Sequence, residues 1–301
     1  MFRRKEVHAM KIRQNLHIHS QHSCDSACAT LADIQKEMLQ CGMTEFGLSD
    51  HLHTHYNLCD IQGARNDFLC AERPSSFHFG IEVSSVSEWE CSQIAAGNFE
   101  RKGDDPVYGL RFADGPSDST PRIGITKEEI ETLGIEYVIG GVHWPLYSKP
   151  DRESAWMDYF NQMMALIKNP LVTILAHPWD SLELAAGDWY RHRDANHIDF
   201  GAITDIPRNL NDQLMEALIR YDKPAELNLG VLNSLRFPES CIKYYWNLFA
   251  QWREAGVKFT LGSDQHSAHA NIPLFAASGL LLDCYGFKEE SIRYLFEEQN
   301  H

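Results

Sequence analysis

Apolar residues along the chain fall into short runs, separated by longer stretches with helical spacing. Seven runs, mostly rich in β-branched and aromatic residues, are expected to form strands: 12–19, 44–50, 77–83, 136–143, 171–177, 225–229 and 257–263. The stretches between and after them predict helices over 31–42, 126–134, 154–170, 238–256 and 289–299. Strands that alternate with helices favour an α/β fold with a mainly parallel sheet.

Local signals mark several of the expected helix ends. The first helix is expected to stop at Gly42, because glycine readily adopts the left-handed conformation that often follows the last turn. Thr126 is a possible N-cap, since Glu129 three residues later completes a capping-box pattern. The helix over 238–256 carries an aromatic stripe, which we expect to pack against the wall of a barrel.

Two connections are much longer than the few residues usual between neighbouring elements. Residues 84–125 follow the third expected strand, and residues 178–212 follow the fifth. Both are polar, and folded segments resume directly after each. We therefore expect both to be loops or lids over one face of a single domain that spans 1–301.

Composition and charge narrow the choice of partners. The 301 residues are 44% hydrophobic and 23% charged, which is a normal globular balance. The formal net charge of −15 argues against an extended nucleic-acid surface, which would need a basic stripe. A small anionic substrate is compatible with this charge, because bound divalent cations invert the local field.

The eight cysteines are scattered and contain no CxxC pair, so we expect free thiols in a reducing cytoplasm rather than a disulfide framework. The start of the chain lacks an apolar core of signal-peptide length, and no apolar run approaches the roughly 18 residues of a membrane span. These features predict a cytoplasmic protein without a membrane partner. The oligomeric state is left open.

Metal-binding side chains stand at the ends of six of the seven expected strands. They are His17, His19, Asp50, His51, Glu82, His143, His177, Asp264 and His266. His17 and His19 flank an isoleucine and would share one face of a strand, because alternate residues point to the same side. In a parallel barrel the C-terminal strand ends meet at one face, where catalytic residues gather. Histidine, aspartate and glutamate suit zinc, manganese or iron, so the pattern predicts a metal centre.

Six motifs, in this order, resemble the signature of the PHP (polymerase and histidinol phosphatase) domain family: HIHSQHSCD, GLSDH, GIE, GGVHW, LAHPW and LGSDQH. The resemblance runs from about residue 11 to residue 270. It implies a distorted TIM-like barrel of seven βα units, in agreement with the seven strands expected above. Stand-alone members of the family are metal-dependent phosphoesterases with a trinuclear site.

Carried over motif by motif, the resemblance implies three metal positions. His17 and His19 with Asp264 would hold the first ion, and Glu82 would bridge it to a second. His143 and His177 would complete the second position. The third would be held by Asp25, His51 and His266.

The third position is the least determined of the three. Asp25 stands where relatives differ in spacing, and His22 is the nearest substitute. His53 and His55 could share a face with His51 if the strand continues. Asp50 is expected to orient an imidazole from outside the metal position.

The resemblance implies hydrolysis of a phosphomonoester of a small molecule by a hydroxide that bridges two of the metal ions. Divalent cations lower the pKa of bound water and clamp phosphoryl oxygens. Glu82, His177 and Asp264 are the candidate catalytic residues, and two or three ions of zinc, iron or manganese are the expected cofactors. The substrate would be a small phosphorylated compound, with a histidinol-phosphatase-like activity as one possibility.

Residues that would bind the rest of the substrate are poorly determined by sequence. Six arginines lie in or beside loops that follow strands: Arg122, Arg152, Arg191, Arg193, Arg208 and Arg236. Arginine suits phosphate, but for each one a solvated surface position is the commoner outcome. Trp144 and Trp179 could wall the pocket or pack beneath the loops. Cys24 is expected to be an inert thiol.

Two other function classes stay open. A barrel hydrolase that cleaves amides or lactones is disfavoured, because such enzymes commonly use a carbamylated lysine and no lysine occupies an expected strand end. A non-catalytic metal-binding protein would be expected to have lost ligands, whereas the set here is complete. A polymerase-associated nuclease is disfavoured by the acidic charge.

Overall fold

The computed structural model describes residues 9–25, 27–98, 115–267 and 271–297. Its strands are β1 (Gln14–Asn15), β2 (Glu45–Leu48), β3 (His51–Leu52), β4 (Phe77–Ser84), β5 (Val86–Ser87), β6 (Pro121–Arg122), β7 (Tyr137–Gly141), β8 (Ile174–Leu175), β9 (Ala225–Asn228) and β10 (Phe259–Gly262). Its longer helices are α1 (Leu31–Gln40), α2 (Leu58–Cys70), α3 (Glu88–Ala95), α4 (Lys127–Leu133), α5 (Arg152–Lys168), α9 (Arg208–Arg220), α11 (Glu239–Glu254) and α12 (Asn271–Cys284). The shorter ones are α6 (Leu182–Ala186), α7 (Trp189–His192), α8 (Gly201–Thr204) and α10 (Leu229–Leu232).

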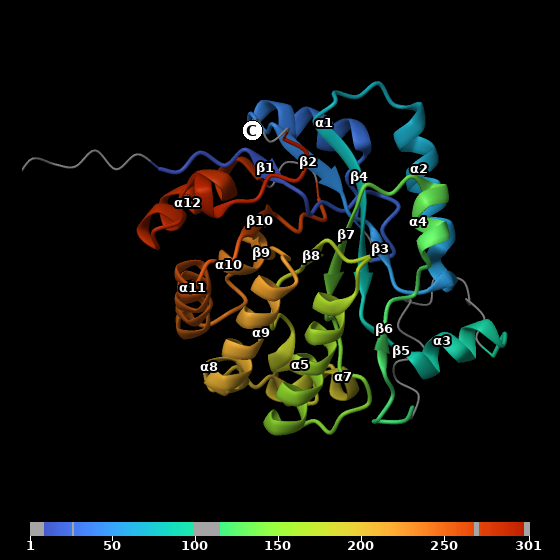
Figure 1. The fold of residues 1–301 in the computed structure, drawn as a ribbon, viewed down its shortest axis with the longest axis vertical. Coiled ribbons are helices and arrows are strands. Elements are labelled where there is room, and N and C mark those ends of the chain that lie inside the picture. The colour runs from blue at the N-terminus through green and yellow to red at the C-terminus, as the bar shows by residue number, and fades with distance from the viewer. Residues whose placement is uncertain (1–8, 26, 99–114, 268–270, 298–301) are drawn as a thin grey trace, which may run out of the picture.

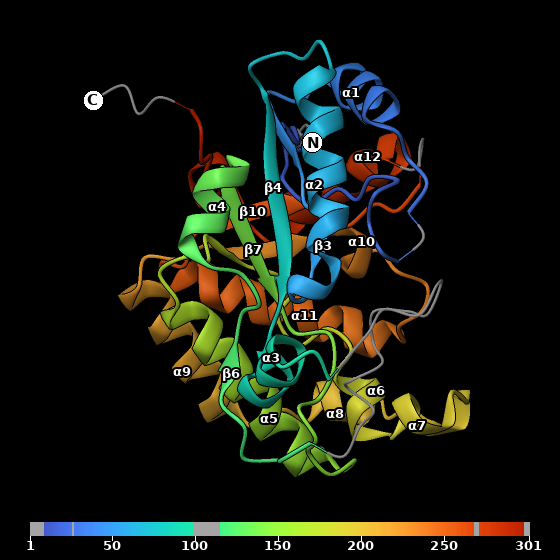
Figure 2. The ribbon, with the colours of Figure 1, turned by 90° about the vertical axis from the view of Figure 1, so that its right-hand side faces the viewer.

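The main sheet is parallel and nearly closes into a barrel. Its strands follow the order β1-β2-β4-β7-β8-β9-β10, and β3 also pairs with β4. Closure comes from the contact between β1 and the end of β10, where the amide of Leu16 donates to the carbonyl of Leu261 at 2.9 Å. Helices lie outside the strands (Figures 1 and 2). The expected α/β barrel is confirmed, and each of the seven expected strands overlaps a strand of this sheet.

The end of the barrel where the strands begin is filled by a large aromatic side chain. The ring of Tyr137 lies across β2 and β4, where a Cβ on Gly47 or Gly80 would approach its atoms to 2.4 Å. The tyrosine hydroxyl lies 2.6 Å from the carbonyl oxygen of Leu48. The two glycines are therefore needed for close approach rather than for an unusual backbone conformation.

The expected helix over 289–299 is wrong within the described residues. Only Glu289–Ser291 form a short 3-10 turn, and the following residues are extended. The amides of Leu295 and Phe296 donate to the buried carboxylate of Glu45 at 3.0 and 2.9 Å. The ring of Phe296 packs edge-on against Tyr137, with 5.9 Å between ring centroids. The buried carboxylate competes for backbone donors that a helix would have used internally, so this segment closes the barrel floor.

Several local expectations are confirmed. Gly42 follows α1 with φ +72°, and Thr126 with Glu129 forms a capping box at the start of α4. The aromatic residues of α11 are buried against the core. Four of the longer helices, α2, α3, α9 and α12, were not among those expected from sequence.

The two long connections contain short elements of their own. In residues 84–125, β5 pairs with β6 in antiparallel fashion and α3 follows β5, while residues 99–114 lie outside the described part. Residues 178–212 fold into α6, α7 and α8 and then enter α9 (Figure 2). Within the described residues, no helix is both long and apolar enough to cross a membrane. None of the eight cysteines forms a disulfide.

Candidate metal centre

Side chains from six strand ends meet at the C-terminal face of the barrel. All nine residues expected as metal ligands lie in this one cluster: His17, His19, Asp25, His51, Glu82, His143, His177, Asp264 and His266. The parallel register places His51 directly beside Glu82 on the neighbouring strand. A cavity of about 370 Å³ opens over the cluster. Their roles as ligands stay a prediction, but their convergence is a structural fact.

The first group of donor atoms comprises two imidazole nitrogens and two carboxylate oxygens. The Nε2 atoms of His17 and His19 lie 3.1 Å apart, and each lies near Asp264 Oδ1, at 3.4 and 3.2 Å. Glu82 Oε2 lies 3.1 Å from the first of these nitrogens and 3.5 Å from the second. Ligands about 2.1 Å from a tetrahedral zinc ion stand roughly 3.3 Å apart, so the spacing fits such an ion.

Glu226 supports this group from behind and was missed by sequence reasoning. Its Oε1 lies 2.7 Å from His17 Nδ1, which places the ring proton on Nδ1 and leaves the Nε2 lone pair facing the cluster. Its Oε2 accepts the backbone amide of His177 at 2.9 Å. A Cβ on Gly262 would lie 2.0 Å from this carboxylate, so only glycine fits there. The available signal was a glutamate in the middle of the otherwise apolar strand β9.

The second group lies on the other oxygen of Glu82. Its Oε1 is 3.0 Å from His143 Nε2 and 2.8 Å from His177 Nε2. The adjacent Gly141 leaves space for all three side chains, because a Cβ there would lie 2.7 to 3.0 Å from their atoms. Glu82 therefore faces two sets of nitrogen donors, one with each oxygen, as a carboxylate that bridges two ions would.

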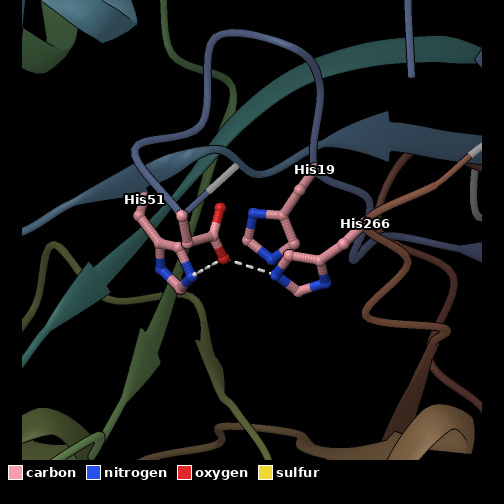
Figure 3. A group of neighbouring side chains, drawn as sticks. His19, His51 and His266 are labelled. Carbon is pink, nitrogen blue, oxygen red and sulfur yellow. Dashed lines mark hydrogen bonds and ion pairs between the residues drawn. The ribbon is translucent and has the colours of Figure 1, made fainter. Parts of the chain in front are cut away.

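The third group forms around Asp25. Its Oδ2 lies 3.1 Å from His51 Nε2 and 2.5 Å from His266 Nε2. His19 stacks on both rings at centroid distances of 4.4 and 4.3 Å, and Figure 3 shows the three imidazoles gathered together. Asp25 Oδ1 is buried and has no hydrogen-bond partner among the described residues. An oxygen without a donor fits a cation that would complete its coordination.

His22 points elsewhere, so the geometry favours Asp25 as the third-position candidate. His22 Nε2 lies 2.7 Å from Asp67 Oδ2 on α2. His53 is buried and hydrogen-bonded to Ser84 at 2.6 Å, and the exposed His55 pairs with Glu129 at 3.0 Å. None of the three histidines stands in a donor group.

The expectation that Asp50 orients an imidazole is wrong. The carboxylate accepts the backbone amide and the hydroxyl of Ser20, both at 2.6 Å. Burial raises its pKa, and the two hydrogen bonds from Ser20 act in the opposite direction. Asp50 therefore holds the turn that follows His19, because these local donors satisfy its oxygens before any ring can reach them.

Charges in the cluster are strongly coupled. Burial would raise the pKa of Glu82, but the imidazoles, His17 first, outweigh it and hold the pKa well below its ordinary value. Burial and the neighbouring His51 lower the pKa of His19 to about 4. Burial would likewise lower the pKa of His17, but carboxylates led by Glu226 raise it well above the ordinary value. An incoming cation would therefore meet ionised carboxylates and a neutral His19, and would displace a proton from His17.

The wall of the cavity beyond the donor groups is aromatic and charged. Trp144, Trp189 and Tyr190 line it together with Arg193 and Arg236. The guanidinium of Arg236 lies 2.8 Å from Asp180, which also lines the cavity. Trp179 is buried and donates to Asn211 instead.

The other four candidate arginines pair with acidic residues that do not line this cavity. They are Arg122 with Glu88, Arg152 with Asp199 and Asp205, Arg191 with Asp188, and Arg208 with Asp212. Cys24 lies beside the cluster, with its Sγ 3.4 Å from His53 Nε2. Residues 178–212 thus contribute three side chains to the wall apart from the arginine, namely Asp180, Trp189 and Tyr190.

Comparison with solved structures identifies two neighbours of the fold. The first is a histidinol phosphate phosphatase (HisK) from Lactococcus lactis subsp. lactis Il1403, complexed with zinc, L-histidinol and phosphate. It matches with TM-score 0.53 and 16% identity, over 91% of this chain and 94% of that one. The second, assigned as the histidinol phosphatase HisK of Listeria monocytogenes, has TM-score 0.54 and 10% identity, over 88% and 99%.

No protein-family model matches the chain, and no curated protein matches it. The two structural neighbours show that the fold is a barrel of the histidinol-phosphatase type. At such low identity they establish the fold, while the chemistry has to be argued from the residues of this chain.

Proposed function

We propose that this protein is a metal-dependent phosphomonoesterase for small substrates, with two or three divalent ions held by the nine clustered side chains. The observation that carries the proposal is the position of Glu82, whose two oxygens face separate sets of histidines at 2.8 to 3.5 Å. Zinc is the first ion to test, because the Lactococcus lactis neighbour is complexed with it. Bound ions of this kind lower the pKa of water and neutralise charge on a phosphoryl group.

The residues of this chain would divide the remaining work. Glu226 and Asp264 fix the rings of His17 and His19, so the donor atoms are preorganised before an ion arrives. The cavity of about 370 Å³ suits a small ester rather than a long polymer. Arg193 and Arg236 stand in its wall, where a guanidinium can bind phosphate oxygens. Histidinol phosphate is the first substrate to try, given the ligands of the Lactococcus lactis neighbour.

The test is phosphate release from a panel of phosphomonoesters that includes histidinol phosphate. Protein stripped with a chelator is reconstituted with Zn²⁺, Mn²⁺ or Fe²⁺ and compared with the stripped form. We expect metal-dependent release that His177→Ala abolishes, because this ring completes the donor set on Glu82 Oε1.

His22→Ala is the matched control, since His22 lies outside the donor groups and pairs with Asp67. Its activity should stay within about threefold of the unmodified chain, as expected for a partly exposed ion pair of small energetic value. Release that is indifferent to chelation, or equally lost in both variants, would refute the proposal. Hydrolysis of amides or lactones, but of no phosphomonoester, would replace it with the other hydrolase class.

A further inference from the structure

A chain of hydrogen bonds leads away from the second donor group into the protein. The Nδ1 atom of His143 lies 2.8 Å from Ser84 Oγ, and the same hydroxyl lies 2.6 Å from His53 Nδ1. His53 Nε2 in turn lies 3.4 Å from Cys24 Sγ. Ser84 and His53 are both buried, so water does not compete for these contacts.

The direction of the chain follows from counting protons. For His143 to offer Nε2 to an ion, its ring proton must sit on Nδ1, which then donates to Ser84 Oγ. The single hydroxyl proton of Ser84 is left to donate to His53 Nδ1. His53 must therefore accept at Nδ1 and carry its own proton on Nε2, which faces Cys24. Every member has one consistent role only when His143 presents a lone pair toward Glu82.

We propose that Ser84 and His53 are positioning residues, forming a hydrogen-bond relay that holds His143 in the tautomer and orientation required to bind a divalent ion through Nε2. The inference rests on the proposed metal centre but not on its phosphatase activity. Ser84 ends β4, two residues after Glu82, so one strand supplies both a candidate ligand and the group that orients another. Edge-on packing of His53 against Trp144, with 5.1 Å between ring centroids, fixes the far end of the relay.

The neighbouring serine offers a matched control. Ser85 is as buried as Ser84, yet its hydroxyl has no hydrogen-bond partner among the described residues. Ser84→Ala and Ser85→Ala therefore delete the same atom from adjacent buried positions, and only the first breaks the relay. For His53, asparagine keeps a polar atom near the place of Nδ1, whereas phenylalanine keeps the ring and removes the acceptor.

The experiment measures affinity for Zn²⁺ by competition with a chromogenic chelator, using the full chain. The visible spectrum of Co²⁺-loaded protein serves as a second readout of the coordination geometry. Ser84→Ala is expected to weaken binding of one ion by 10- to 100-fold, the usual effect of losing a partner behind a ligand. Ser85→Ala should match the unmodified chain. His53→Asn should bind nearly normally, and His53→Phe should bind more weakly than His53→Asn.

Equal affinities for Ser84→Ala and Ser85→Ala, with unchanged Co²⁺ spectra, would overturn the relay. If Ser84→Ala does not fold, the His53 pair decides: equal binding by asparagine and phenylalanine variants also overturns it. A chain that binds ions and shows the Ser84 effect, but hydrolyses no phosphomonoester, would sink the proposed function and leave the relay standing. Failure to bind any divalent ion would refute both.

Discussion

Gly141→Ala should damage metal binding far more than it damages the fold. Gly141 is the last residue of β7, and its φ does not require glycine. An added Cβ would lie 2.7 Å from Glu82 Oε1, 2.8 Å from His143 Cε1 and 3.0 Å from His177 Cε1. These atoms belong to the second donor group, so the methyl would push directly on all three of its side chains.

The size of the effect follows from those distances. Ordinary contacts of a Cβ begin near 3.4 Å, so each side chain must retreat by about 0.4 to 0.7 Å. Overpacking of this kind costs roughly 1 to 3 kcal/mol in stability. A metal site needs its donors within about 0.5 Å of the productive geometry. We therefore expect at least a tenfold loss of affinity for one ion, about 1.4 kcal/mol.

Gly140→Ala is the matched control, because it overpacks the preceding residue of the same strand on the opposite face. Its Cβ would lie 2.9 Å from Val172 and 3.0 Å from Leu166, both apolar and distant from the donors. Urea unfolding of the stripped proteins should give similar losses for the two variants. Chelator competition should show lost Zn²⁺ affinity only for Gly141→Ala. Equal metal affinity in both variants would refute the assignment of this donor group.

Two further variants probe groups outside the donor set. Burial and Asp180 raise the pKa of Glu183 from 4.5 to about 8, so stability is lost as pH rises from about 4.5 to 8. Glu183→Gln should therefore resist urea better than the unmodified chain at pH 8, by at most about 5 kcal/mol, and match it at low pH; no difference at pH 8 would contradict this. Phe296→Ala should lower stability by roughly 2 kcal/mol, because it loses the stack on His78 and the contact with Tyr137. Its Zn²⁺ affinity should stay unchanged, and a loss would show that the barrel floor couples to the site.

The strands could be predicted because their signal is local. β4 and β10 are short apolar runs bounded by polar residues, and both were expected within a few residues of their observed ends. The final segment could not, since Ile292, Leu295 and Phe296 have helical spacing and no local feature opposes a helix. Its conformation is decided by the carboxylate of Glu45, about 250 residues earlier in the chain. A long-range partner of this kind leaves no trace in periodicity.

The clustering of the metal donors could be expected for a similar reason: strand ends in a parallel barrel meet whatever connects them. The residues behind the donors were harder to find. Glu226 sits in the middle of β9, and its importance depends on the facing position of Gly262, which only three-dimensional packing reveals. Asp50 was misjudged because its nearest donors, on Ser20, come from a turn whose shape sequence does not specify.

The supporting residues explain why glycines surround a site made of histidines and carboxylates. A bridging carboxylate such as Glu82 must approach several rings at about 3 Å, and each ring needs its own partner on the far side. Two layers of polar groups then compete for space with the strands that carry them. Gly141 and Gly262 relieve this at the two places where a Cβ would meet a donor or its partner. Glycine at such strand ends is therefore part of the metal-binding chemistry, and replacing it should change the ion before it changes the fold.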